Sequence, residues 1–286
     1  MKVPKGGIAF FDSGVGGLTV LAKCREYLPD ALFYYYGDNH HAPYGNLSNN
    51  KIRRYVRKAF STFACLKVRA VVIACNTVTT VCIEELRKRY PFPIIGTEPA
   101  VQSAAKMGGD IFVLTTRATF ESEKFKNLYQ SVQSRYPQAN IQPQPCDGLA
   151  GAIEKHLTES GFDFTPFLPR GSPDVVVLGC THYIYIEETV RKYYACSTLH
   201  GNDGVARRLM EVLKKEGDLT TEGVNLGEYR DTQPHLTTPK LKTRKKGQEG
   251  VRNRQNVAKN NKTIFLGKCQ VVNKTQYEQM FAHKNR

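Results

Sequence analysis

The sequence lacks any apolar run that approaches the about 18–20 residues needed to cross a bilayer. Its first residues, MKVPKGGIAFFDSG, begin with basic side chains, but the apolar stretch after them is short and interrupted by glycine, unlike a secretory signal peptide. These absences predict a soluble, cytoplasmic protein with no membrane partner. The 286 residues suffice for one large domain or two moderate ones.

The eight cysteines lack the close CxxC pairing that zinc sites and disulfide frameworks usually show. We therefore expect no metal site. In a cytoplasmic chain, most of these residues should be reduced thiols buried in the core. A catalytic thiol must be recognised from its surroundings, because the number of cysteines does not identify one.

Acidic residues are too few to balance the basic ones, and the formal net charge is +15. Residues 240–262 hold nine Lys or Arg and one acid, so nine minus one gives +8 in this segment. The segment contains no aromatic residue that could stack on bases. A solvated loop is therefore the favoured interpretation, and nucleic acid is not an expected partner.

Apolar runs alternate with amphipathic stretches over most of the chain. Strands are expected at 7–12, 32–38, 70–76, 92–98, 111–116, 174–180, 197–201 and 263–267. Helices are expected at 16–28, 49–67, 203–215 and near 275–283. Continuous apolar strands between helices predict a doubly wound α/β protein with a mainly parallel sheet, and the pattern is compatible with two halves of similar rhythm.

The expected domain boundaries follow the same rhythm. The first domain should comprise residues 1–98 and 206–286, with a polar, basic insertion at about 216–262, and the second should comprise 99–205. In open α/β sheets, ligands bind beyond the carboxyl ends of the strands. Small, polar or reactive side chains follow several of the expected strands: Asp12, Ser13, Asp38, Cys75, Asn76, Thr77, Glu98, Thr116, Cys180, Thr181 and His182.

Two of these strand ends match each other. VVIACNT and VVLGCTH both run from apolar residues through a small residue to a cysteine and two polar groups. In two similar halves that face each other, Cys75 and Cys180 would approach one cleft from opposite sides. Two thiols on opposite faces of a carbon atom can invert it, because one removes a proton and the other delivers one. His182 and Asp12 are candidates to adjust the two thiols.

The DSGVGG stretch lies between a strand and a helix, so its backbone N–H groups could hold an anion. It matches neither GxGxxG nor the P-loop, which requires Gly-Lys-Ser/Thr. The sequence therefore favours a carboxylate here at least as much as a phosphate.

Taken together, FDSGVGGLTVL, YGDNHHAPYG, VIACNT, EPA, VLTTRATFES and VLGCTHY occur in the order seen in glutamate racemases, which the chain resembles from Gly7 to about Leu213. The resemblance implies two doubly wound α/β domains, whose mainly parallel sheets face each other across an active-site cleft, and a homodimer without a cofactor. It implies interconversion of L- and D-glutamate, with the D form used in peptidoglycan synthesis. The alternatives are a racemase of aspartate or another small acidic amino acid, and a nucleic-acid-binding protein that uses residues 240–262.

The resemblance also implies residue roles. Cys75 would deprotonate D-glutamate with help from Asp12, and Cys180 would deprotonate L-glutamate with help from His182. Glu154 falls where the family has a further assisting carboxylate. The substrate would be held by Asp12, Ser13, Tyr44, Gly45, Asn76, Thr77, Thr116, Thr119, Thr181 and His182.

Three positions depart from the family pattern. His41 stands where the family usually has Arg, Thr115 where it has Gly, and Ile184 where it has Pro. None of these departures removes an expected proton-transfer group. They bear on substrate affinity, domain closure and dimer contacts.

Overall fold

The computed structural model describes residues 6–215, 262–267, 274–275 and 277–278. The predicted basic insertion and its 240–262 segment therefore lie outside the described residues, apart from Lys262. Residues 274, 275, 277 and 278 are helical, and the rest of the predicted closing helix also lies outside. No helix in the described part of the chain is long and apolar enough to cross a membrane.

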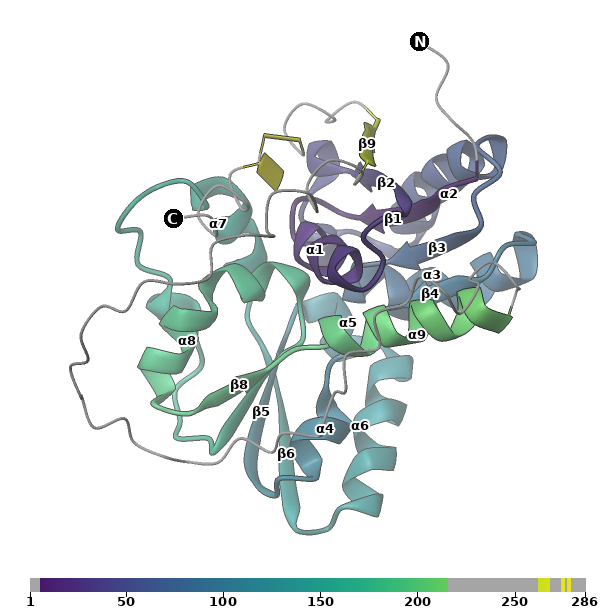
Figure 1. The fold of residues 1–286 in the computed structure, drawn as a ribbon. Helices are drawn as coiled ribbons and strands as arrows, with labels where there is room; N and C mark the ends of the chain where they lie inside the picture. Colours follow the sequence, from purple (N-terminus) through teal and green to yellow (C-terminus); the bar gives the residue numbers. More distant parts are fainter. Residues whose placement is uncertain (1–5, 216–261, 268–273, 276, 279–286) are drawn as a thin grey trace, which may run out of the picture.

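Two separate sheets organise the structure (Figure 1). The first has the strand order β4-β3-β1-β2-β9, and the second has the order β6-β5-β7-β8. Every strand pairing in both sheets is parallel. The first sheet consists of β1 (Ile8–Asp12), β2 (Leu32–Gly37), β3 (Ala70–Ile73), β4 (Ile94–Gly96) and β9 (Lys262–Leu266). The second consists of β5 (Gly109–Thr115), β6 (Ala139–Pro145), β7 (Val175–Leu178) and β8 (Ser197–Leu199). The predicted fold class is confirmed.

The two sheets share one topology. The order β4-β3-β1-β2 in the first corresponds to β8-β7-β5-β6 in the second. In each sheet the chain runs from the first strand to a neighbour on one side and then crosses to the other side. This reversal of strand order creates a switch point between β1 and β3, and another between β5 and β7, which is where ligands bind in such sheets.

Helices cover the sheets and bury the faces that the periodicity predicts. In α2, Ile52, Val56, Phe60 and Phe63 are fully buried at helical spacing against the first sheet. The α-helices are α1 (Leu18–Tyr27), α2 (Asn49–Cys65), α3 (Asn76–Arg89), α4 (Val101–Ala105), α5 (Arg117–Glu121), α6 (Glu123–Arg135), α7 (Leu149–His156), α8 (Glu187–Tyr194) and α9 (Asn202–Lys215). Short 3-10 helices follow two strands, η1 (Asn39–His41) after β2 and η4 (Thr181–Ile186) after β7.

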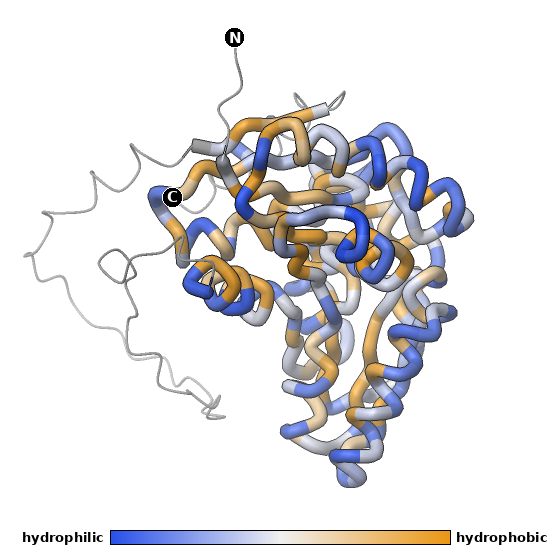
Figure 2. Tube along the Cα trace, turned by 90° about the vertical axis from the view of Figure 1, so that its right-hand side faces the viewer, coloured by the Kyte–Doolittle hydropathy of each residue, from blue (hydrophilic) through white to orange (hydrophobic). Residues whose placement is uncertain are grey.

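The helix α9 returns to the first sheet after the second sheet is complete. It lies beside α1 (Figure 1), and Val205, Leu209 and Leu213 share one core with Leu18 and Leu21. Burial of these apolar side chains stabilises the fold by about 1.5–3 kcal/mol each. Hydrophobic segments run through the interior of the molecule, whereas the outer helices carry hydrophilic stretches (Figure 2).

All eight predicted strands are present, but the sequence did not indicate the ninth, β6. Its sequence, ANIQPQP, has no continuous apolar run and contains Pro143 and Pro145. Proline cannot donate a ladder hydrogen bond and is tolerated at the edge of a sheet. β6 is an edge strand of the second sheet, which explains why this composition still forms a strand.

Candidate active site

The carboxyl ends of the two sheets meet at their switch points. The Thr181 hydroxyl, after β7, donates to Asp12 Oδ2 at the end of β1 over 3.3 Å. Thr77 Oγ1, after β3, lies 3.0 Å from Thr116 Oγ1, after β5. These contacts join residues that lie far apart in the sequence and on different sheets. They bring the predicted site residues into one buried region between the two halves.

Cys75 lies between β3 and α3, and it is 6 % exposed. Its thiol donates to Ser13 Oγ over 3.6 Å, and Ser13 directly follows β1. Burial raises the pKa of the Cys75 thiol to about 12, and the neighbouring Asp12 carboxylate adds to this rise. The Cys180 thiol acts on this pKa in the same direction.

Cys180 occupies the matching position between β7 and η4, where it is 7 % exposed. Its sulfur lies 3.8 Å from His182 Nδ1. The other ring nitrogen, Nε2, lies 2.6 Å from Glu154 Oε2 on α7. The imidazole therefore links a thiol to a carboxylate.

This chain of contacts favours a charged imidazole. Burial by itself lowers the pKa of His182, but its hydrogen bonds with Cys180 and Glu154 outweigh burial and hold that pKa well above the ordinary value. Burial likewise acts to raise the pKa of Glu154, yet the His182 contact and two further hydrogen bonds lower it overall. The Cys180 sulfur therefore faces a histidine whose surroundings favour its charged form.

Asp12 is fully buried at the end of β1. The strand β1 pairs with β3, so Asp12 and Cys75 lie at the carboxyl ends of neighbouring strands. Its Oδ1 accepts from the Gly14 backbone N–H over 2.8 Å. Burial raises its pKa, although the His182 charge acts in the opposite direction. Asp12 therefore acts on Cys75 by its charge, which raises the pKa of the thiol. The hydrogen-bond partner of the Cys75 thiol is Ser13.

The glycines of DSGVGG allow the two halves to approach closely. A Cβ on Gly14 would lie 2.6 Å from the Glu154 carboxylate oxygens, and one on Gly16 would lie 2.5 Å from Thr181 Oγ1 and 2.7 Å from His182 Nδ1. The loop was expected to bind an anion through its backbone. In this structure the anions that it binds are protein side chains, because Gly14 N donates to Asp12 and Val15 N donates to Glu154 Oε2 over 3.4 Å.

The other predicted substrate-binding residues surround the same region. Thr77, Thr116 and Thr119 form a buried hydroxyl cluster, with Thr77 Oγ1 3.5 Å from Thr119 Oγ1. A Cβ on Gly45 would lie 3.0 Å from Thr116, so the backbone at Gly45 lies directly against this cluster. Asn76 is buried and donates through Nδ2 to the Thr97 carbonyl over 3.3 Å.

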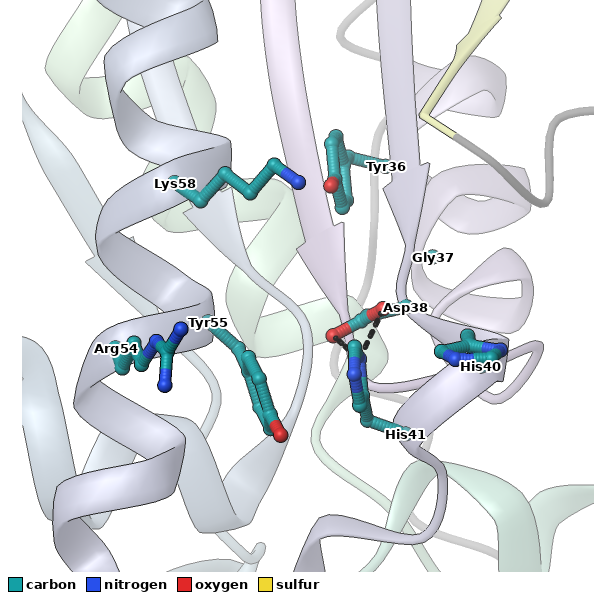
Figure 3. Close-up of a pocket in the computed structure, with 8 residues that line it drawn as sticks. All are labelled: Tyr36, Gly37, Asp38, His40, His41, Arg54, Tyr55 and Lys58. Carbon is teal, nitrogen blue, oxygen red and sulfur yellow. Dashed lines mark hydrogen bonds and ion pairs between the residues drawn. The ribbon is translucent and has the colours of Figure 1, made fainter.

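A cavity of about 470 Å³ lies at the end of β2, and Asp38, His41 and Tyr55 are among the residues that line it (Figure 3). Tyr44 contacts one of these residues, Asp38. Its hydroxyl donates to Asp38 Oδ2 over 2.6 Å, and His41 Nδ1 lies 3.0 and 2.9 Å from the two oxygens of Asp38. The His41 ring stacks on Tyr55 with centroids 3.8 Å apart. His41, at the expected Arg position, therefore shares the Asp38 carboxylate with Tyr44.

Thr115, the second departure from the family pattern, is fully buried. Its hydroxyl has no hydrogen-bond partner among the described residues. Ile184, the third departure, is partly buried against the core of the second sheet. Sequence reasoning missed one residue of this region, Asn39, whose Nδ2 donates to Glu154 Oε1 over 2.6 Å. The available signal was its position, two residues after the end of β2 and next to Asp38.

The fold therefore consists of two parallel-sheet α/β domains of one topology, with a buried cysteine after equivalent strands of each. The model of the Asp/Glu/Hydantoin racemase family matches residues 19–209, and the chain belongs to this family. Its relatives include the glutamate racemase of Clostridium botulinum (strain Hall), which is 36% identical over 232 residues and is aligned over 78% of this chain and 89% of that protein. The glutamate racemase of Clostridium perfringens (strain SM101) is also 36% identical, over 233 residues that cover 74% of this chain and 88% of that protein.

A solved structure shows the same architecture. The Escherichia coli glutamate racemase, in complex with L-glutamate and the activator UDP-MurNAc-ala, superposes with a TM-score of 0.65 and 30% sequence identity. The match covers 74% of this chain and 83% of that structure.

Proposed function

We propose that this chain interconverts L- and D-glutamate by moving the α-proton through Cys75 and Cys180. The observation that carries this proposal is the pair of buried thiols at equivalent strand ends of two sheets with one topology. Its relatives in the family are glutamate racemases, which supports glutamate as the substrate. We also propose that the D-glutamate supplies peptidoglycan synthesis.

In the direction from L- to D-glutamate, the Cys180 thiolate removes the α-proton, and His182 stabilises this thiolate before the transfer. The Cys75 thiol then delivers a proton to the opposite face of the carbanion. At the end of this turnover Cys180 is a thiol and Cys75 is a thiolate. In the reverse direction, the Cys75 thiolate removes the proton from D-glutamate and Cys180 delivers one. Proton exchange between turnovers restores the starting state.

The high proton affinity of Cys75 has two consequences. Its thiolate is a strong base, which suits the weakly acidic α-proton, but that thiolate is scarce at neutral pH. With a pKa of about 12, forming it at pH 7 costs about 7 kcal/mol at 1.36 kcal/mol for each pH unit. The ammonium group of a bound amino acid would offset part of this cost by its charge. Substrate binding and thiolate formation are therefore coupled.

The carbanion also requires stabilisation without exposure to water. Thr77, Thr116 and Thr119 supply hydroxyl groups in a buried setting, where oriented dipoles act more strongly than in water. Because both thiols are buried, glutamate can enter only when the two halves separate. Their closure would then exclude water and complete the site.

Further features of the proposal follow from the resemblance. We place the domain boundaries at 1–98 with 206–286 and at 99–205, which the packing of α9 against α1 supports. We also propose that the protein acts in the cytoplasm as a homodimer.

Circular dichroism of the purified, reduced protein tests the function. The optical signal of L-glutamate and of D-glutamate should decay to zero without an added cofactor. Cys75→Ser and Cys180→Ser should each reduce kcat/KM by more than about a hundredfold, because each removes one of two required proton-transfer groups. A folded wild-type protein that leaves both enantiomers unchanged would overturn the proposal, and decay of aspartate alone would redirect it to that substrate.

A further inference from the structure

We propose that Asn39 is a positioning residue that makes the Cys180 half of the site effective only when the two halves of the protein are closed. The inference rests on the proposed racemase function and concerns a residue outside the predicted site. Asn39 is the first residue of η1, two residues after the end of β2, in the half that holds the first sheet. Its target, Glu154, lies on α7 in the second half.

Glu154 receives three hydrogen bonds, and two of them cross between the halves. Asn39 Nδ2 donates to Oε1 over 2.6 Å, and the Val15 backbone N–H donates to Oε2 over 3.4 Å. The third partner is His182, whose Nε2 lies 2.6 Å from Oε2. Of the two crossing bonds, the one from Asn39 is shorter and is the one made by a side chain. Opening of the halves would break both and leave Glu154 with His182 alone.

The hydrogen bond from Asn39 bears on the charge of His182. A carboxylate held by donors on both oxygens stays ionised, and an ionised Glu154 favours the protonated form of His182. The protonated ring in turn stabilises a thiolate at Cys180, 3.8 Å from Nδ1. Loss of the Asn39 donor would make the ionised form of Glu154 less favourable. The charge of His182, and with it the Cys180 thiolate, would then be less stable.

A second observation points to the same role. The Oδ1 atom of Asn39 is buried and has no hydrogen-bond partner among the described residues. A buried acceptor without a partner costs free energy, and such a group in a native structure calls for an explanation. The hydrogen bond from Nδ2 to Glu154 gives a reason for an amide at this position, although its oxygen has no partner among the described residues.

The Cys75 half does not depend on this contact. The Cys75 thiol donates to Ser13, and no hydrogen bond joins Asn39 to Cys75 or Ser13 among the described residues. The role of Asn39 is therefore one-sided. Because L- and D-glutamate have equal free energies, kcat/KM must be the same in both directions for every variant. A one-sided role must instead appear in which proton transfer limits the rate.

Isotope effects on kcat/KM with α-deuterated substrates measure this directly. Asn39→Leu keeps a similar side-chain size but removes the donor, and we expect kcat/KM to fall about tenfold in both directions, the usual scale for a partner of a functional group. The isotope effect should increase with α-deuterated L-glutamate, because proton removal by Cys180 becomes slower. It should decrease toward one with α-deuterated D-glutamate, because Cys180 then limits the second step.

His40→Leu is the matched control, since it makes the same change at the exposed neighbouring residue and should leave both isotope effects unchanged. Asn39→Ser is the second variant if Asn39→Leu is unstable to heat. Isotope effects that stay at their wild-type values, or that move in the same direction for both enantiomers, would overturn the proposal. An unchanged kcat/KM would overturn it as well.

A readout independent of turnover separates this inference from the proposed function. Nitrogen-15 NMR of the histidine side chains reports the protonation of His182, whose pKa should decrease in Asn39→Leu and stay unchanged in His40→Leu. An inactive wild-type protein with this pKa shift would overturn the racemase function but retain the positioning role of Asn39. An active protein without the shift would overturn the inference alone.

Discussion

The hydroxyl oxygens of Thr77 and Thr116 lie 3.0 Å apart, although the two residues follow strands of different sheets. Thr77 is the second residue of α3, and Thr116 is the N-cap of α5. Thr116 Oγ1 also accepts from the Thr119 backbone N–H over 3.3 Å. One threonine therefore begins a helix in its own half and contacts the other half across the site.

A double-mutant cycle on this pair should show direct coupling. Thr116→Val should lower the free energy of unfolding by about 1–2 kcal/mol, because it removes a helix cap and a hydrogen bond. Thr77→Val should lower it by about 0.5–1.5 kcal/mol through the loss of the hydrogen bond between the halves. Urea denaturation of both single variants and the double variant should give a coupling energy above about 0.5 kcal/mol. Strictly additive losses would show that the two hydroxyls do not interact in solution.

Gly16 should tolerate no side chain, because a Cβ there would lie 2.5 Å from Thr181 Oγ1 and 2.9 Å from the His182 backbone nitrogen. Gly16→Ala should therefore force the halves apart and lower kcat/KM by about a hundredfold, as a displacement near 1 Å can do. The measurement is the rate of racemisation by circular dichroism.

Gly204→Ala is the control for this prediction. Gly204 lies in α9, and nothing lies within 4 Å of the place where its Cβ would be. The change should leave kcat/KM unaltered and stabilise the helix by about 0.5–1 kcal/mol. Equal activity of Gly16→Ala and wild type would contradict the close approach described here.

The reactivity of the cysteines should follow burial and proton affinity. Cys65 is exposed, whereas Cys75 and Cys82 are buried and have pKa values raised to about 12, mainly by burial. Iodoacetamide at pH 8 should modify Cys65 first, and peptide mass spectrometry identifies the modified residues. The rate at Cys75 should rise about tenfold for each pH unit from 7 to 9, because its thiolate fraction grows in that proportion below the pKa. A plateau in this range would show that the Cys75 pKa is not raised.

The His182–Glu154 contact should stabilise the protein in a defined pH window. The folded-state pKa of His182 is raised above 6.5, so its contribution is complete below 6.5 and is lost as pH rises through the folded value. The folded-state pKa of Glu154 is lowered below 4.5, so its contribution is complete above 4.5 and is lost as pH falls through the folded value. Both contributions are complete together between 4.5 and 6.5.

Glu154→Gln should lose the most stability in that window. We expect a loss of about 1.5–3 kcal/mol at pH 5.5, the range for a hydrogen bond to a charged group, and smaller losses at pH 3 and at high pH. Urea denaturation across the pH series measures the difference from wild type. A difference that does not vary with pH would show that His182 and Glu154 are not a charged pair.

Much of the fold was predictable because its information is local. Continuous apolar runs and helical spacing predicted eight strands and the helices α1, α2 and α9 close to their observed bounds. The edge strand β6 was not predictable in this way, because Pro143 and Pro145 disguise a segment whose pairing depends on β5. Strand formation there is decided by a neighbour and not by the composition of the segment.

In the candidate site, too, the sequence identified the residues with a local pattern and missed those that depend on a distant partner. The matching ends of β3 and β7 identified Cys75 and Cys180, because the residue after a parallel strand must lie at the carboxyl edge of its sheet. No comparable pattern identified Asn39, whose partner Glu154 lies 115 residues away on the other half. The function of Gly14 and Gly16 was also hidden, since the atoms that exclude a Cβ there belong to residues 154, 181 and 182.

Hydrophobic periodicity and residue chemistry act over short stretches of chain, so the sequence was enough to predict eight of the described strands, the helices α1, α2 and α9, and the types of reactive group at the strand ends. Which of these groups contact each other across the two halves depends on the tertiary structure. In the folded protein the Cys75 thiol donates to Ser13, and His182 lies between Cys180 and Glu154. The backbone N–H of Val15 in the DSGVGG loop donates to the Glu154 carboxylate. The physical reason is that contacts of a few ångströms depend on how two packed sheets are placed, and that placement is set by all of the buried side chains together.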